Sequence, residues 1–158
     1  MKIKIIQIGK NKDKYLDEGV NEFLKRLKSF CKIEIQTLKE IAPSKTFTKE
    51  KCVELEGKEI LANLENSDED FIVALDERGR EFTSIEFAKF LQQRNSLGIS
   101  LCFIIGGAFG LSSEVKKRSN LMISFSKMTF THQMIRMFLL EQIYRGFCIS
   151  TGKVYHHS

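Results

Sequence analysis

The chain has 158 residues, of which 42% are hydrophobic and 28% are charged, and its formal net charge is +5. This composition is that of a globular protein with one sizeable core, and it excludes the collagen-like, disordered and membrane-spanning classes. The charge is unevenly spread, because residues 1–32 and 115–158 carry +5 and +6 while residues 33–114 carry −6. A fold that brings both ends to one face would create a basic patch for a polyanion.

The cysteines are widely scattered and form no CxxC pair. They lie at Cys31, Cys52, Cys102 and Cys148. This spacing argues against a zinc site and against a disulfide framework, and it favours the reducing cytoplasm. The acidic residues show no paired metal-ligand spacing either. We expect no metal, no signal peptide and no membrane segment.

The first half of the chain alternates between strand and helix patterns. We predict strands at residues 2–8 and 31–38, helices at 13–29 and 48–64, and a polar loop at 40–47. Lys10, Lys12 and Lys14 lie where the first strand passes into the first helix, where they could meet phosphate or form an ordinary exposed loop. An acidic turn is expected at residues 66–70.

The second half continues the alternation. We predict strands at residues 71–75, 101–105 and 121–123, helices at 84–95, 113–119 and 134–147, a charged turn at 76–80 and a loop at 124–131. Strands that alternate with helices indicate an α/β fold, with a mostly parallel sheet and helices on both faces. No repeat or boundary divides residues 1–158, so we expect a single Rossmann-like domain.

The last predicted helix is the most hydrophobic in the chain, and its apolar residues cover more than one side. A helix that is apolar on two sides packs on its own sheet and is expected to pack on a second subunit as well. This pattern predicts a homodimer.

A glycine turn follows the central strand. Gly106, Gly107 and Gly110 come between the apolar run at residues 101–105 and Ser112 and Ser113, which predict the start of a helix. Glycines there would let another molecule approach the backbone, as at ligand sites beside the carboxyl ends of strands. A tight turn without a ligand is the alternative.

Three strand ends, at residues 75–79, 106–110 and 124–131, are expected to converge on one pocket. Leu75, Ile105, Met128 and Phe130 would supply apolar walls. Such a pocket suits an adenosine group that is bound through backbone hydrogen bonds and apolar contacts. The chain has no GxxxxGK[ST] P-loop, no GxGxxG motif and no GxSxG nucleophile elbow.

Four motifs taken together resemble a known family. They are IIGGAFGL, SFSKMTFTHQMIR, LLEQIYRGF and the terminal VYHH. The chain resembles the SPOUT-class ribosomal RNA methyltransferases over its whole length, and within them the large-subunit methyltransferase H family, which N3-methylates a pseudouridine in 23S rRNA. The resemblance implies S-adenosylmethionine as methyl donor, a homodimer, the ribosome as partner and a C-terminal trefoil knot.

The resemblance also implies site residues. The donor site would comprise Leu75, Gly106, Phe125, Ser126, Lys127, Met128, Thr129 and Phe130. Arg145, Tyr155 and His156 would act at the target nucleotide, and Arg136 matches another basic position. Thr131 stands where the family commonly has proline, which suggests a less rigid loop, and His157 stands where it often has Arg or Lys.

Alternatives remain open from the residues alone. Met128 and Phe130 are core side chains by default, Lys127 and Arg145 could be surface charges, and His132 is left out of the site. Tyr155 and His156 could belong to a frayed terminus. The alternative functions are an RNA-binding protein without catalysis and a nucleotide-sensing regulator.

Overall fold

The computed structural model describes residues 1–65 and 71–155, so the acidic turn expected at 66–70 and the tail from His156 lie outside the described residues. The elements are β1 (Lys2–Ile8), α1 (Lys14–Leu27), β2 (Lys32–Leu38), α2 (Lys49–Glu65), β3 (Phe71–Glu81), α3 (Ser84–Ser96), β4 (Leu101–Ile105), α4 (Ser113–Arg118), β5 (Leu121–Ser124) and α5 (His132–Thr151).

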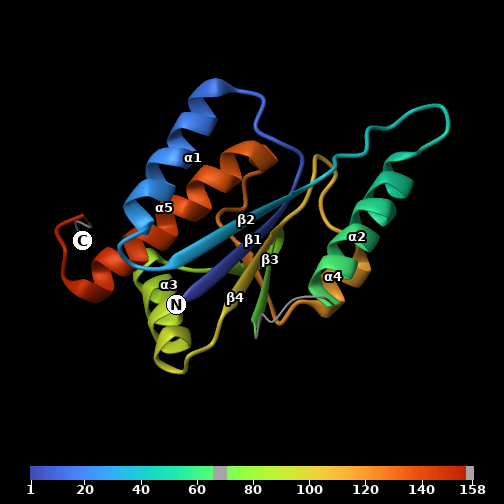
Figure 1. The fold of residues 1–158 in the computed structure, drawn as a ribbon. Helices are drawn as coiled ribbons and strands as arrows, with labels where there is room; N and C mark the ends of the chain where they lie inside the picture. The colour runs from blue at the N-terminus through green and yellow to red at the C-terminus, as the bar shows by residue number, and fades with distance from the viewer. Residues whose placement is uncertain (66–70, 156–158) are drawn as a thin grey trace.

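The five strands form one sheet in the order β2-β1-β4-β3-β5, and every neighbouring pair is parallel. Helices α1, α3 and α5 cover one face of this sheet, and α2 and α4 cover the other (Figure 1). The predicted α/β fold with a parallel sheet and two helical layers is therefore confirmed. All strands end at the same edge, where the connecting loops can build a site.

The central strand β4 is buried on both sides, as its uninterrupted apolar sequence predicts. Leu101 and Phe103 pack into the core beneath α1, α3 and α5. Cys102 and Ile104 pack into the second core, beneath α2 and α4. Because successive side chains of a strand point to opposite faces, each side of β4 is covered by its own helical layer.

Strand β3 is longer than predicted, and the charged turn expected at residues 76–80 is wrong. The strand continues to Glu81, with a register shift between Leu75 and Arg80 where it pairs with β5. At Gly79 a Cβ atom would lie 2.5 Å from the carbonyl carbon of Ile123. The pairing with β5 keeps this charged stretch extended, and the glycine permits the close backbone contact that local sequence pattern does not reveal.

Helix α5 begins and ends beyond the predicted residues 134–147. The Thr131 side chain accepts a hydrogen bond from the backbone N–H of Met134, which caps the start of the helix, and Gly152 ends it with a left-handed φ of 69°. A proline at position 131 would supply no such cap. Thr131 therefore caps α5 at the end of the preceding loop, and the expectation that this loop is less rigid than one with proline stays a prediction.

The core side of α5 carries the apolar residues Leu139, Leu140, Ile143 and Phe147. Met134, Phe138 and Ile149 lie on its other side and are half-buried. The prediction that α5 has apolar residues on two sides is confirmed.

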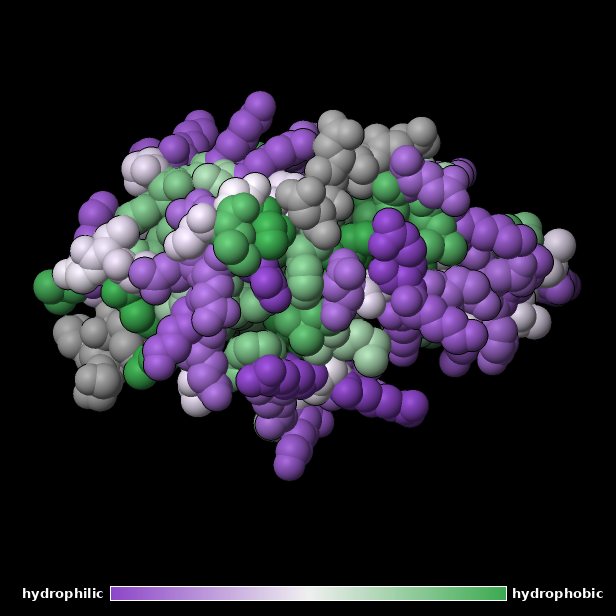
Figure 2. Space-filling model, turned by 90° about the horizontal axis from the view of Figure 1, so that it is seen from below, coloured by the Kyte–Doolittle hydropathy of each residue, from purple (hydrophilic) through white to green (hydrophobic). Residues whose placement is uncertain are grey.

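The underside of the molecule, where the strands begin, is largely hydrophilic, with apolar side chains grouped between the polar ones (Figure 2). Among residues 1–65 and 71–155, no helix combines the length and apolarity needed to cross a membrane.

Candidate functional site

A cavity of about 880 Å³ lies at the carboxyl ends of the strands. Residues 75–78 of β3 line it, together with the β4–α4 turn and Lys116 of α4. The end of β5, the β5–α5 loop and the first turn of α5 complete the lining. The predicted convergence of the segments 75–79, 106–110 and 124–131 on one pocket is confirmed, although residues 75–79 lie inside β3 and not at its end. The volume is at the large end of the range for small-molecule sites, which is about 300–1,000 Å³.

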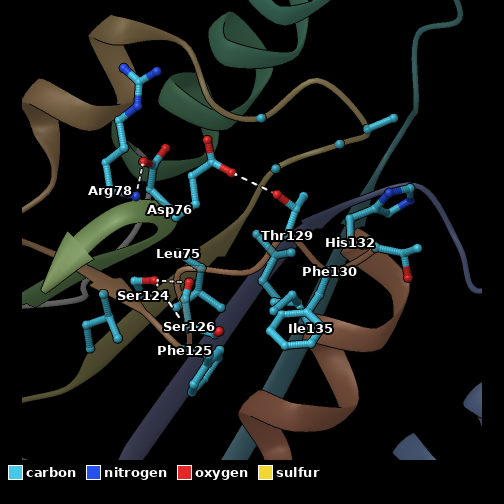
Figure 3. Close-up of a pocket in the computed structure, with 18 of the residues that line it drawn as sticks. Leu75, Asp76, Arg78, Ser124, Phe125, Ser126, Thr129, Phe130, His132 and Ile135 are labelled. Atoms are coloured by element: carbon cyan, nitrogen blue, oxygen red, sulfur yellow. Dashed lines mark hydrogen bonds between the residues drawn. The ribbon is translucent and has the colours of Figure 1, made fainter. Parts of the chain in front are cut away.

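Apolar side chains supply much of the cavity wall. They include Leu75, Ile105, Ile123, Phe130 and Ile135. Figure 3 shows the side chains of Leu75, Phe125, Phe130 and Ile135 grouped in one part of the cavity, with Asp76 and Arg78 above them. The cavity therefore combines an apolar compartment with a charged one.

The charged part is organised by Asp76. A carboxylate oxygen of Asp76 lies 2.6 Å from Lys116 Nζ in α4, and the other accepts a hydrogen bond of 3.0 Å from the backbone N–H of Arg78. Burial alone would raise the pKa of Asp76, but the hydrogen bond from Lys116 and that from Arg78 outweigh burial, so the pKa is lowered. Asp76 is thus an ionised, fixed carboxylate beside the apolar compartment.

Hydrogen bonds hold the β5–α5 loop in shape. The hydroxyl of Ser124 donates to the carbonyl of Ser126 at 2.8 Å, and the Ser126 hydroxyl accepts from the backbone N–H of Met128 at 3.0 Å. Thr129 Oγ1 donates to Glu77 Oε2 at 3.2 Å, which joins this loop to β3 across the cavity (Figure 3). The cavity is therefore preformed in the free protein.

The glycine turn serves its own packing. A Cβ atom on Gly106 would lie 2.8 Å from the carbonyl carbon and oxygen of Gly110, and one on Gly107 would lie 2.8 Å from Glu56 Oε2. The positions where these side chains would start are thus occupied by the protein. The expectation that the missing Cβ atoms make room for a ligand is wrong for these two glycines, although both still line the cavity.

The first turn of α5 is fastened to the segment after β1. Gln133 Oε1 accepts a hydrogen bond of 2.7 Å from the backbone N–H of Lys12. The buried guanidinium of Arg136 donates to Asn11 Oδ1 at 2.9 Å and to the carbonyl of Ile8. Burial lowers the pKa of Arg136 to about 10. Arg136 therefore positions α5 against β1, and does not belong to an exposed basic surface.

His132 lines the cavity, although the sequence pattern did not assign it to the site. Burial, followed by the nearby charge of Arg136, lowers the pKa of His132, so the imidazole is neutral at neutral pH. His132 directly follows Thr131, a residue type that often caps a helix. This position is the signal that could have placed His132 at the start of α5, beside the loop that precedes the helix.

The predicted donor residues are gathered in one place, with one exception. Leu75, Gly106 and the loop residues Phe125, Ser126, Met128, Thr129 and Phe130 all line the cavity, whereas Lys127 is not among the lining residues. The Met128 side chain is 74% exposed, so the alternative that it is a core residue is wrong. Phe130 packs edge-on against Phe138 of α5, with 5.3 Å between ring centroids.

The predicted target-site residues lie elsewhere. Arg145 follows the cavity residue Ile135 by ten positions on α5, which at about 1.5 Å per residue corresponds to about 15 Å along the helix. Figure 1 shows α5 running from the end of the β5–α5 loop towards the C terminus. Within one chain, Arg145 and Tyr155 are not brought to the cavity.

Tyr155 is ordered against α5, so a frayed terminus at this residue is excluded. Its ring lies 4.8 Å from that of Tyr144 and 4.9 Å from the guanidinium carbon of Arg145, and its hydroxyl donates to Glu141 Oε1 at 3.2 Å. Burial and the charge of Glu141 raise the pKa of Tyr155, so its hydroxyl stays protonated at neutral pH. Arg145 Nε donates to the same carboxylate at 3.0 Å. His156 lies outside the described residues.

Across residues 1–65 and 71–155, no group of three or more His, Cys, Asp or Glu side chains is placed to hold a metal ion. None of the four cysteines, all of which lie in the described part of the chain, forms a disulfide bond.

Solved structures with a similar fold include a probable methylase family protein from Haemophilus influenzae. It has a TM-score of 0.57 and 12% identity over 99% of this chain and 70% of that one. A putative methyltransferase from Legionella pneumophila, solved with bound SAM, has a TM-score of 0.54 and 13% identity over 93% of this chain and 66% of that one. At these identities the likeness establishes the fold.

Sequence relatives are much closer. The chain is 46% identical to the ribosomal RNA large subunit methyltransferase H of Streptococcus pneumoniae, in strains CGSP14 and TIGR4, over 99% of both chains. The family described as "Predicted SPOUT methyltransferase" matches residues 1–156. The chain therefore belongs to the SPOUT methyltransferases, and among them to the large-subunit methyltransferase H family.

Proposed function

We propose that this protein transfers a methyl group from S-adenosylmethionine to N3 of a pseudouridine in 23S rRNA of the large ribosomal subunit. The observation that carries the proposal is the preformed cavity at the carboxyl ends of β3, β4 and β5, in a chain so similar to relatives named as large-subunit rRNA methyltransferases. From this ribosomal substrate we infer that the protein acts in the cytoplasm.

The cavity residues fit the donor. Leu75, Ile105 and Phe130 offer an apolar compartment for an adenine ring, and the ionised Asp76 lies beside it, where a carboxylate can bind a hydroxyl or a cationic group. When bound, S-adenosylmethionine supplies an electrophilic methyl group on a positively charged sulfur. The volume of about 880 Å³ accommodates a molecule of that size with space left beside it.

The main contribution of the protein to such a reaction is position. Holding two reactants at attack distance supplies about 7–11 kcal/mol of the barrier. N3 of the base forms a bond to the methyl carbon as the bond from that carbon to sulfur breaks, and N3 loses its proton. Arg145 is a cation that can stabilise the developing anion, and His156 can accept the proton. Tyr155 is unsuited to accept it, since its raised pKa keeps the hydroxyl protonated.

Arg145 and Tyr155 reach the cavity only if a second copy supplies them. Arg145 and Tyr155 lie beyond the middle of α5, whereas the donor cavity is at its start. We propose a homodimer in which the carboxyl end of α5 from one subunit completes the cavity of the other. The half-buried apolar residues on the outer side of α5, Met134, Phe138 and Ile149, provide the surface for this contact. The trefoil knot implied by the family resemblance stays a prediction.

Two measurements test the activity. Titration calorimetry with S-adenosylmethionine should show one donor site per chain, and absence of binding at millimolar donor would refute the enzyme. Mass spectrometry of 23S rRNA from cells with and without the gene should reveal one missing N3-methylated pseudouridine in the deletion strain. If the modification is unchanged, the proposed substrate is wrong.

The dimer is tested by sedimentation. Ile149→Glu places a charge on the outer side of α5 and should convert dimers to monomers, with loss of methylation and an intact donor cavity. Ser150→Glu is the matched control, because Ser150 is exposed at the next position. A monomeric wild type at micromolar concentration would refute the shared site.

A further inference from the structure

The β4–α4 turn carries an exposed aromatic residue at the edge of the donor cavity. Phe109 is 42% exposed and lines the cavity. It is one of the two residues between Gly107 and Gly110, which form an antiparallel bridge, with a hydrogen bond of 3.1 Å from the Gly110 N–H to the Gly107 carbonyl. Gly110 has a φ of 82°, which favours glycine and closes the turn. The turn therefore holds Phe109 outward.

A cation lies against this ring. Lys49 Nζ is 5.4 Å from the centroid of Phe109, and Lys49 is the exposed first residue of α2. The connection before α2 extends away from the sheet (Figure 1), and Ser44 shapes it by accepting hydrogen bonds from the backbone N–H groups of Thr46 and Phe47 at 3.1 and 3.2 Å. An exposed ring and an exposed ammonium group are thus presented together beside the cavity.

A second exposed apolar side chain borders the same cavity from another loop. Met128 is 74% exposed and belongs to the β5–α5 loop. The buried wall of the cavity already provides apolar contacts for a ligand that fills its interior. Phe109 and Met128 lie outside this wall, so they add contact area only for a ligand that extends beyond the interior. A flat, apolar group with a negative charge attached to it matches an aromatic ring beside an ammonium group.

We propose that Phe109 and Lys49 form the entry contact for the RNA: an unpaired base stacks on the Phe109 ring, and Lys49 contacts a phosphate next to that base. The proposal rests on the proposed function, since the reacting nucleotide must reach a methyl group held in this cavity. Stacking on an aromatic residue tolerates any base, so this contact positions the strand and does not read its sequence.

The test of the ring compares Phe109→Ala with Phe109→Tyr, which keeps the aromatic face. Phe47→Ala is the matched control, because Phe47 is 37% exposed and does not line the cavity. The substrate is ribosomes from the deletion strain, assayed with tritiated donor. For Phe109→Ala we expect kcat/KM for ribosomes to fall roughly ten- to hundredfold. Phe109→Tyr and Phe47→Ala should stay near wild type, and the donor Kd from calorimetry should stay unchanged throughout.

The test of the cation uses salt dependence. Losing one phosphate contact should reduce the slope of log affinity against log salt by about 0.7 for single-stranded RNA. We expect this change in slope for Lys49→Ala. It is measured by fluorescence anisotropy with a 23S rRNA fragment that contains the target pseudouridine before methylation. Lys45→Ala, an exposed lysine four residues earlier, should leave the slope unchanged.

Three results would overturn the proposal. Equal kcat/KM for Phe109→Ala and Phe47→Ala would show that the ring does not contact the substrate. A weakened donor Kd in Phe109→Ala would assign the ring to the donor, and an equal slope change in both lysine variants would remove the special role of Lys49. These results leave the proposed function intact, whereas a wild-type protein that methylates no ribosomes refutes both.

Discussion

Gly79→Ala tests how the β3–β5 contact builds the site. Gly79 does not have a positive φ, so alanine carries no backbone penalty there. Its Cβ atom, however, would lie 2.5–2.7 Å from backbone atoms of Ile123 and Met122. Real Cβ atoms do not approach backbone so closely, and strand β5 would have to move.

The expected cost follows from the atoms that are in the way. Overpacking a core costs about 1–3 kcal/mol when side chains can adjust. Here the obstacle is the backbone of a paired strand, so we expect a cost of about 3 kcal/mol, at the top of that range. For a domain of this size, that loss lowers Tm by about 6–12 °C. Because the loop after β5 lines the cavity, donor affinity should fall as well.

Urea unfolding measures the first effect, and calorimetry with S-adenosylmethionine measures the second. Gly98→Ala is the control, because a Cβ atom there meets nothing within 4 Å and only its φ of 70° opposes the substitution. That conformation costs about 1–2 kcal/mol. Gly98 precedes the amino end of β4, whereas the cavity is lined from the carboxyl end of this strand. If Gly79→Ala is as stable as wild type and binds the donor equally well, the close β3–β5 contact does not shape the cavity.

Three further predictions concern ionisable groups. Burial raises the pKa of Glu56 above its ordinary 4.5. The stability that the protonated carboxyl contributes is therefore present below pH 4.5 and is lost as the carboxyl ionises. Glu56→Gln should increase the free energy of unfolding at neutral pH, with no gain below pH 4.5. The pKa of Asp76 is lowered from 3.8, so the stability that its carboxylate contributes is present above that pH and is lost in acid. In urea unfolding, Asp76→Asn should lower the free energy of unfolding by about 1–3 kcal/mol at neutral pH, and this difference should vanish in acid. Burial raises the pKa of the Cys31 thiol to about 11. Iodoacetamide should therefore alkylate Cys31 much more slowly at neutral pH than it alkylates a free cysteine, as followed by mass spectrometry. Equal rates would contradict the burial of this thiol.

Much of the fold could be predicted from local pattern. The apolar run at residues 101–105 predicts a strand buried on both faces, and β4 is such a strand. The helix predicted at residues 84–95 is α3 (Ser84–Ser96), and the structure shows both hydrogen bonds of a capping box between Thr83 and Glu86 at its start. These features depend on neighbours in the chain, which a sequence displays directly.

The site could be predicted only in outline. The three strand ends that line the cavity were expected to converge, because parallel strands end at one edge of a sheet. The roles of the glycines were not predictable, since Gly106 packs on Gly110 and Gly107 on Glu56, a residue of α2 that lies about fifty positions earlier. Such contacts join segments that no local pattern connects.

The sequence by itself determined the order of the elements, the two buried faces of the sheet and the family to which the chain belongs. Only the tertiary structure decided that Arg136 is a buried link to Ile8 and Asn11 and that Tyr155, beyond the end of α5, packs back against Tyr144 of that helix. It also decided that Arg145 lies about 15 Å along α5 from the cavity. The physical reason is that a basic or aromatic residue has the same letter whether it is exposed, buried or facing a second subunit, and only the packing of distant segments separates these cases.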